Sequence, residues 1–145
     1  MQFAVYPSLK GKVAYVTGGA GGIGESIVDA FARNGTTVGI LDLDETGGSS
    51  VAKKLTAAGI KSAFVKVDLR DIDDLKSSLA NLKSQIGPAD ILVNNAAHDQ
   101  RHDWKDVTPE YWDERMAVNL RHMFFAIQSV APDMLARKSG SIVNF

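Results

Sequence analysis

Short apolar runs alternate along the chain with longer stretches whose apolar residues recur at helical spacing. The short runs, rich in β-branched residues, predict strands at residues 12–17, 37–42, 60–67, 90–94 and 141–145. Helical spacing predicts helices at 22–34, 45–58 and 71–86, and a stretch at 111–137 that is long enough for two consecutive helices. Strands alternating with helices predict βαβ units with right-handed crossovers. We therefore expect an α/β, Rossmann-like fold: a doubly wound parallel sheet in three α/β/α layers, with strand order 3-2-1-4-5, ending after the fifth strand.

Composition places the chain among ordinary globular proteins. Hydrophobic residues make up 45% of the 145 residues and charged residues 23%, which excludes intrinsic disorder. A net charge of −1 offers no positive field for nucleic acid or an anionic membrane, and the lack of cysteine excludes disulfides and thiolate zinc sites. No apolar run could span a bilayer, and no signal-peptide pattern begins the chain. We expect one domain over residues 1–145 in the cytoplasm, with neither nucleic acid nor membrane as a partner.

Glycines gather between the first predicted strand and the first predicted helix. Six of the 13 glycines fall between Gly11 and Gly24, and residues 17–24 read TGGAGGIG. Such a loop lets the backbone approach a pyrophosphate, which the free N–H groups of a helix N-terminus attract. No Lys-Ser or Lys-Thr pair follows, so a Walker A loop is excluded. A tight turn without ligand is the alternative, but the number of glycines favours dinucleotide binding.

Asp42 ends the second predicted strand. In a dinucleotide-binding fold, a carboxylate at this place accepts hydrogen bonds from the hydroxyls of the adenosine ribose. It also repels a 2′-phosphate, and no arginine follows it immediately. We therefore predict NAD as the cofactor, with NADP binding less well. The alternative is a solvated acid, which is our interpretation of Asp44 and Glu45.

Together these residues resemble the short-chain dehydrogenase/reductase family. The glycine loop is similar to the family's TGxxxGIG, and Asp68-Leu69 is similar to the acidic and apolar pair that holds the adenine ring. Residues 94–97 (NNAA) resemble the family's NNAG, with alanine in place of the glycine. Asn119 resembles the asparagine of the catalytic tetrad, and residues 141–145 resemble the strand that leads into the catalytic serine.

The resemblance implies an NAD(P)-dependent oxidoreductase that transfers a hydride between nicotinamide and an alcohol or carbonyl. It implies a catalytic role for Asn119 in a locally opened helix; a solvent-facing side chain is the alternative. The implied cofactor-binding residues are Gly18, Gly22, Ile23, Gly24, Asp42, Asp68, Leu69, Asn95 and Ala96. Asn94 and Asn95 could instead only tie neighbouring strands together. The family's serine, tyrosine and lysine have no counterpart in these 145 residues, so we expect an inactive front part of a longer enzyme.

The polar loop 98–104 (HDQRHDW) is expected at the mouth of the site. Its acids, amide and bases suit a polyhydroxylated substrate, and the resemblance is greatest to NAD-dependent sugar or polyol dehydrogenases. A solvated surface loop, a 3-oxoacyl-carrier-protein reductase and a non-catalytic dinucleotide-binding module stay open as alternatives. We expect no metal site, because the two histidines of the loop lack a third ligand at a fixed spacing. Surplus apolar residues on the long helical stretch predict a homo-oligomer, a dimer or a tetramer.

Overall fold

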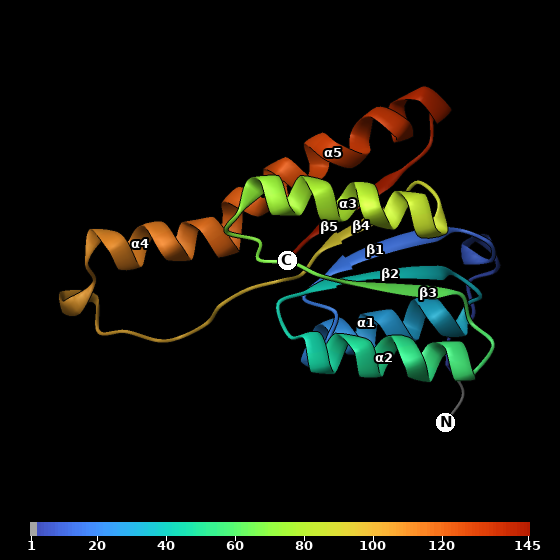
Figure 1. The fold of residues 1–145 in the computed structure, drawn as a ribbon, viewed down its shortest axis with the longest axis horizontal. Coiled ribbons are helices and arrows are strands. Elements are labelled where there is room, and N and C mark those ends of the chain that lie inside the picture. Colours follow the sequence, from blue (N-terminus) through green and yellow to red (C-terminus); the bar gives the residue numbers. More distant parts are fainter. Residues whose placement is uncertain (1–2) are drawn as a thin grey trace.

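A computed structural model describes residues 3–145, which contain a five-stranded sheet. Its strands are β1 (Val13–Thr17), β2 (Thr37–Asp42), β3 (Ser62–Lys66), β4 (Ile91–Asn94) and β5 (Ser141–Asn144). They lie in the order β3-β2-β1-β4-β5, and every neighbouring pair is parallel (Figure 1). The predicted strand order is confirmed, and the carboxyl ends of all five strands lie at one edge of the sheet.

Helices cover both faces of the sheet, which gives the predicted three layers (Figure 1). α1 (Gly22–Arg33) and α2 (Glu45–Ala57) pack on one face, and α3 (Ile72–Ile86) and α5 (His122–Arg137) pack on the other. The first three of these helices begin and end within one residue of their predicted bounds. α4 (Pro109–Met116) leads into α5 and does not cover the sheet.

The sheet separates two apolar layers. Tyr15 and Leu92 belong to the layer under α3 and α5, whereas Ala14 and Val16 belong to the layer under α1 and α2. All four are buried, as expected for parallel strands covered on both faces. The Tyr15 hydroxyl donates a hydrogen bond to the carbonyl of Gly87 at 2.7 Å, and burial raises the pKa of Tyr15. This core fixes β1 at the centre of the sheet, together with the glycine loop that follows it.

The long helical stretch begins at Pro109 and is not one regular α-helix. The Thr108 hydroxyl accepts a hydrogen bond from the backbone N–H of Tyr111 at 3.2 Å, and Pro109 takes the first helical position, where no N–H is needed. Between α4 and α5, residues Ala117–Arg121 form a π-helical turn around Asn119. Such a turn takes one residue more than an α-helical turn, and the apolar spacing of residues 111–137 did not mark its place.

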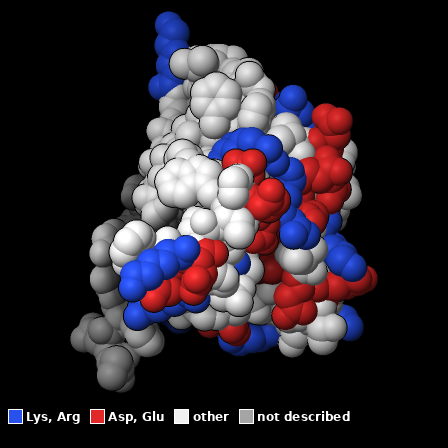
Figure 2. All heavy atoms as spheres, turned by 90° about the vertical axis from the view of Figure 1, so that its left-hand side faces the viewer, with Lys and Arg blue, Asp and Glu red and all other residues white. Residues whose placement is uncertain are grey.

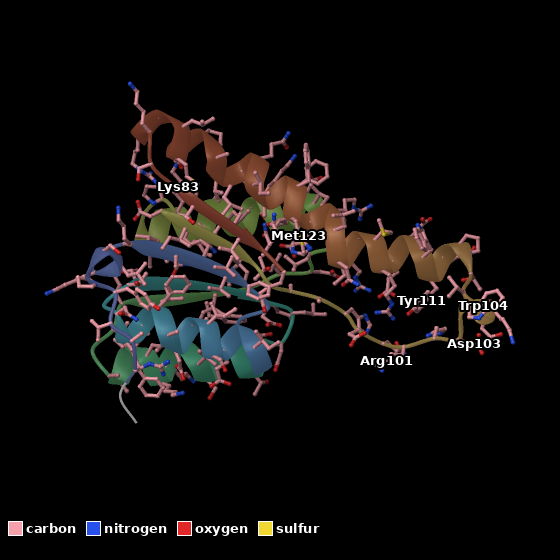
Figure 3. All side chains as sticks on the ribbon, turned by 180° about the vertical axis from the view of Figure 1, so that it is seen from behind. Lys83, Arg101, Asp103, Trp104, Tyr111 and Met123 are labelled. Carbon is pink, nitrogen blue, oxygen red and sulfur yellow. The ribbon has the colours of Figure 1, made fainter. Side chains whose placement is uncertain are left out.

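α4 and the segment before it project beyond the layers of the sheet (Figures 1 and 3). Asp103 and Trp104 lie at the outer end of this projection, and Arg101 lies partway along it (Figure 3). Trp104 belongs to a short 3-10 turn, Trp104–Asp106, and is 80% exposed. Much of the predicted polar loop therefore lies away from the carboxyl edge of the sheet.

Candidate functional site

The glycine loop joins β1 to α1 at the carboxyl edge of the sheet. Gly18 has φ +68°, which favours glycine, and a Cβ there would lie 2.8 Å from Cα of Ala96. A Cβ on Gly24 would overlap the carbonyl oxygen of Gly18. Gly21 differs, because a Cβ there would meet no atom within 4 Å. The first two glycines thus let the loop close against the chain after β4, and Gly21 borders open space.

Hydrogen bonds tie the glycine loop to the segment after β4. The buried Thr17 hydroxyl accepts from the backbone N–H groups of Asn95 at 3.0 Å and Ala96 at 3.1 Å. The Asn95 amide donates to the carbonyls of Thr17 and of the next residue, both at 3.1 Å. The Asn94 amide donates to Oδ1 of Asn144 at 2.8 Å. Both side chains therefore tie neighbouring strands, and they hold the two segments in a fixed relation.

Asp42 ends β2 beside the glycine loop, and both oxygens of its carboxylate accept hydrogen bonds. Oδ2 accepts from the backbone N–H of Ala20 at 2.9 Å, and Oδ1 accepts from that of Asp44 at 3.0 Å. The Asp44 carboxylate in turn accepts from the backbone N–H of Gly47 at 3.0 Å and caps α2. The backbone thus fixes the direction of the Asp42 carboxylate.

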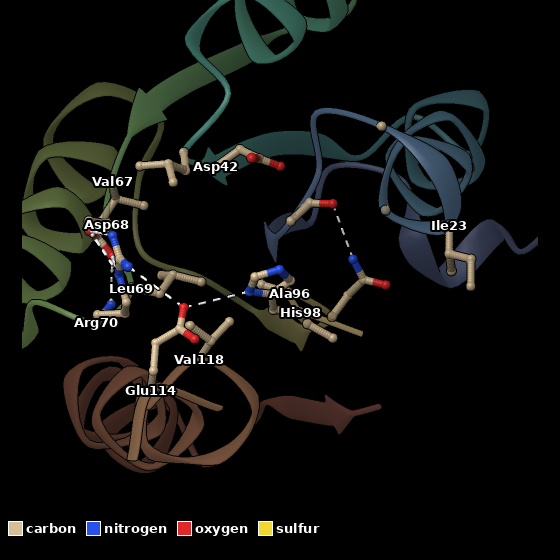
Figure 4. Close-up of a pocket in the computed structure, with 16 residues that line it drawn as sticks. Ile23, Asp42, Val67, Asp68, Leu69, Arg70, Ala96, His98, Glu114 and Val118 are labelled. Carbon is tan, nitrogen blue, oxygen red and sulfur yellow. Dashed lines mark hydrogen bonds and ion pairs between the residues drawn. The ribbon is translucent and has the colours of Figure 1, made fainter. Parts of the chain in front are cut away.

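A cavity of about 550 Å³ opens at the carboxyl edge of the sheet (Figure 4). Most of the predicted site residues line it: Gly18, Ile23, Gly24, Asp42, Asp68, Leu69, Asn95 and Ala96. Gly22 does not line it and is the first residue of α1, whereas Asn119 contacts His98, which does. The cavity has the size of a small-molecule or cofactor site.

Asp68 follows β3 and pairs with Arg70. Nε and Nη2 of Arg70 donate to its carboxylate, with 2.6 Å between Nη2 and Oδ2. Hydrogen bonds from the Arg70 side chain lower the pKa of Asp68. The apolar side chains of Val67 and Leu69 are buried next to it in the same wall of the cavity. An acceptor between apolar groups suits a flat ring that carries an amino group.

Asn119 lies in the π-helical turn and holds the chain that follows β4. Its Oδ1 accepts from the backbone N–H of His98 at 2.8 Å, and its Nδ2 donates to the carbonyl of the same residue at 3.3 Å. The expected local opening of the helix is therefore present. The Asn119 side chain is half-buried, and both polar groups of its amide are bonded to the His98 backbone.

The expectation that loop 98–104 lies at the mouth of the cavity is correct for His98 and wrong for its outer part. The Tyr111 hydroxyl donates to the carbonyl of Gln100 at 2.6 Å and holds the loop against α4. Arg101 and Trp104 therefore follow the projection away from the cavity (Figure 3). Within residues 3–145, no group of three or more His, Asp or Glu side chains is placed to hold a metal ion.

Eight lining residues were not among the predicted cofactor-binding ones: Gly21, Leu43, Val67, Arg70, Ala97, His98, Glu114 and Val118. Gly21 lies within the glycine loop and could have been chosen from it. Arg70, His98 and Glu114 come from the β3–α3 loop, the segment after β4, and α4. The sequence placed His98 at the mouth of the site, but the contacts of Glu114 with Arg70 and His98 form only in the fold. Nothing in the spacing of three separate segments indicates those contacts.

Charges of both signs cover the surface around the projection. Figure 2 views the molecule along it, and acidic and basic side chains lie interspersed there beside uncharged areas. This face therefore carries no continuous basic surface of the kind that collects nucleic acid. Over residues 3–145, no helix has the length and hydropathy required to cross a membrane.

Known proteins resemble this chain over nearly its whole length. Residues 12–145 match the family described as short chain dehydrogenase. D-xylose 1-dehydrogenase of Caulobacter vibrioides is 43% identical over 145 residues, which are 100% of this chain and 57% of that protein. "Probable galactose dehydrogenase GalD" of Rhizobium meliloti is 40% identical over 141 residues, 97% of this chain and 55% of that protein.

A solved structure agrees with the fold. The crystal structure of a blue fluorescent protein from a metagenomic library, in complex with NADPH, has a TM-score of 0.81 at 31% identity, over 86% of this chain and 51% of that chain. This chain spans about half the length of the curated relatives it matches. Because the family match extends over residues 12–145 and includes the glycine loop, this chain belongs to the short-chain dehydrogenase family.

Proposed function

We propose that this chain is the cofactor-binding part of an oxidoreductase that transfers a hydride between a nicotinamide dinucleotide and an alcohol or carbonyl group. The observation that supports this proposal is the cavity bounded by the glycine loop. Gly21, where a Cβ would meet no atom, is the N-cap of α1, and no side chain caps the free N–H groups there. These groups and the helix dipole suit a pyrophosphate. Residues 1–145 then form one dinucleotide-binding domain.

In this proposal, each wall of the cavity binds a different part of the dinucleotide. The Asp42 carboxylate accepts from the ribose hydroxyls, and the wall with Asp68 and Leu69 holds the adenine ring. The loop of Gly18, Gly22, Ile23 and Gly24 takes the pyrophosphate, and Asn95 and Ala96 border the nicotinamide side. The nicotinamide supplies the hydride chemistry when it is bound. Asn119 acts by holding His98 at the cavity through two hydrogen bonds.

NAD is the proposed cofactor, in preference to NADP. Two backbone N–H groups fix the Asp42 carboxylate, so it cannot turn away from a 2′-phosphate without losing both hydrogen bonds. Arg70, the arginine that lines the cavity, is paired with Asp68 on another wall. The blue fluorescent protein holds NADPH, so the preference rests on Asp42 and not on membership of the family.

A sugar or polyol is the proposed substrate class. Two relatives are named for xylose and galactose, and each matches nearly the whole of this chain. A cytoplasmic location is part of the same proposal.

Calorimetric titration of the full-length protein with NAD⁺ tests the proposal. Gly21→Val should fold normally, because the side chain enters open space, and should weaken NAD⁺ binding about tenfold or more by filling the place of the pyrophosphate. Ala58→Val, on the exposed end of α2, is the control. When D-xylose or D-galactose is added to the full-length enzyme together with NAD⁺, the absorbance of NADH should rise. Undiminished binding by the Gly21 variant would refute the assignment of the loop.

A homo-oligomer, dimer or tetramer, is also proposed. Leu120, Phe124 and Leu135 on the long helical stretch are 55%, 64% and 75% exposed. Burial of such side chains between subunits would stabilise an assembly by about 1.5–3 kcal/mol for each side chain fully buried. Light scattering of the full-length protein at micromolar concentration should give a multiple of the subunit mass, and a monomer would contradict the proposal.

A further inference from the structure

Glu114 lies on α4 and lines the cavity, and its carboxylate contacts three basic side chains. Oε1 lies 3.7 Å from Nη1 of Arg70 and 3.6 Å from Nδ1 of His98. Oε2 lies 3.5 Å from Nη2 of Arg115. Figure 4 shows the first two contacts extending from Glu114 toward opposite parts of the cavity wall. One carboxylate therefore joins two segments that are far apart in the sequence.

The Arg70 contact leads to the wall with Asp68. Arg70 binds the Asp68 carboxylate through Nε and Nη2, and its backbone carbonyl accepts from Nη2 of Arg121 at 2.7 Å. The loop after β3 is thus held at two points from the helical stretch that contains α4. Because Arg70 is half exposed, its side chain has few other constraints on its direction.

The His98 contact leads to the segment after β4. Nη1 of Arg115 donates to the carbonyl of His98 at 3.4 Å, and Nη2 donates to Oε1 of Gln100 at 3.1 Å. The Arg115 guanidinium also lies 4.6 Å from the centre of the Tyr111 ring, and its side chain is only 13% exposed. This well-packed arginine anchors the Glu114 carboxylate from the side of α4.

We propose that Glu114 is a positioning residue for the adenine side of the cofactor site. It holds the Asp68–Leu69–Arg70 wall and the His98 segment at a fixed separation, so that the adenine ring meets a preformed slot. This inference rests on the proposed function. The direction in which the affinity changes when Glu114 is replaced distinguishes two roles. A carboxylate that acts only through its charge repels an anionic nucleotide, so its removal would tighten binding. Removing a positioning group weakens binding.

The test is the affinity of the full-length protein for 5′-AMP and NAD⁺ in wild type and Glu114→Gln. We expect binding of both ligands to weaken roughly threefold to fivefold, the size typical of partly exposed ion pairs. Asp113→Asn is the matched control on the same helix, and it should leave both affinities unchanged. Arg70→Met removes the Glu114 contact and also the pairing with Asp68, so it should weaken binding at least as much as Glu114→Gln does. Adding Glu114→Gln to Arg70→Met should cost less than it costs in the wild type, because the contact between the two residues is already lost.

The affinities of the wild type and of the variants test the proposed function and the role of Glu114 separately. Failure of the wild type to bind 5′-AMP and NAD⁺ would refute the proposed function itself. Normal wild-type binding with unchanged or tighter binding by Glu114→Gln would overturn the positioning role and leave the proposed function standing. Should Glu114→Gln fail to fold by circular dichroism, the Arg70→Met variant decides: unchanged affinity for 5′-AMP overturns the inference.

Discussion

The Asp42 carboxylate should discriminate against a 2′-phosphate. Both of its oxygens accept backbone hydrogen bonds at 2.9 and 3.0 Å, so its charge is held in place. Two unit charges about 4 Å apart interact by about 4 kcal/mol at an effective dielectric constant of 20. Salt and the open side of the cavity reduce this to about 1–3 kcal/mol, or about fivefold to 150-fold in affinity.

Asp42→Ser removes the charge and tests this value. The ligands are 5′-AMP and adenosine 2′,5′-bisphosphate, which differ only in the 2′-phosphate, and calorimetry gives the ratio of their affinities. The wild type should favour 5′-AMP about tenfold, and the variant should lose most of that preference. The ratio is the readout, because losing the hydrogen bonds to Ala20 and Asp44 can weaken both ligands equally.

Glu45→Gln is the matched control for Asp42→Ser. Glu45 lies close by in the sequence, its side chain is 68% exposed, and it pairs with Lys66 outside the cavity lining. Its removal changes the net charge equally and should leave the affinity ratio as it is. A wild type that binds the bisphosphate as tightly as 5′-AMP would refute the reasoning, and so would an Asp42→Ser variant with an unchanged ratio.

Two further predictions concern stability. Thr17→Val should lower the free energy of unfolding by about 2–4 kcal/mol, because two backbone N–H groups lose their buried acceptor. Urea unfolding measures this loss, with a Thr56→Val substitution at an exposed position as the control. A loss of less than about 1 kcal/mol would contradict the prediction. His122 is fully buried, and burial lowers its pKa, so the unfolded chain binds its proton at higher pH than the fold does. The contribution of neutral His122 to the free energy of unfolding should therefore be fully present above about pH 6.5. Below that pH the free energy of unfolding should fall, by up to about 1.4 kcal/mol at pH 5.5. His122→Leu should remove this fall, whereas the exposed His102→Gln should keep it.

The sequence predicts the sheet well because each strand is a short apolar run between glycines or capped helices. The order of the strands follows from the crossover rule and from the glycine loop after the first strand. Half of the residues that line the cavity were also predicted, since β1, β2, β3 and β4 all end at the same edge of the sheet. These features depend on local patterns and on a general rule of topology.

The remaining features depend on contacts that no local pattern encodes. Glu114 meets Arg70 and His98 only because α4 returns to the cavity after the projecting loop. The π-helical turn at Asn119 coincides with two hydrogen bonds between its amide and the His98 backbone, and only the family resemblance had implied a local opening of the helix there. The outer part of loop 98–104 follows α4 because of the Tyr111 hydrogen bond, and its polar composition is equally suited to either place.

The bonds between Thr17 and Asn95 join residues that are 78 positions apart in the sequence. At a synthesis rate of about 5–20 residues per second, roughly 4–16 seconds pass between the synthesis of the end of β1 and that of the end of its partner β4. During that time one edge of the central strand is open to wrong pairing, and the glycine loop lacks its second wall. The contacts between the glycine loop and the segment after β4 can therefore form only after β4 has been made.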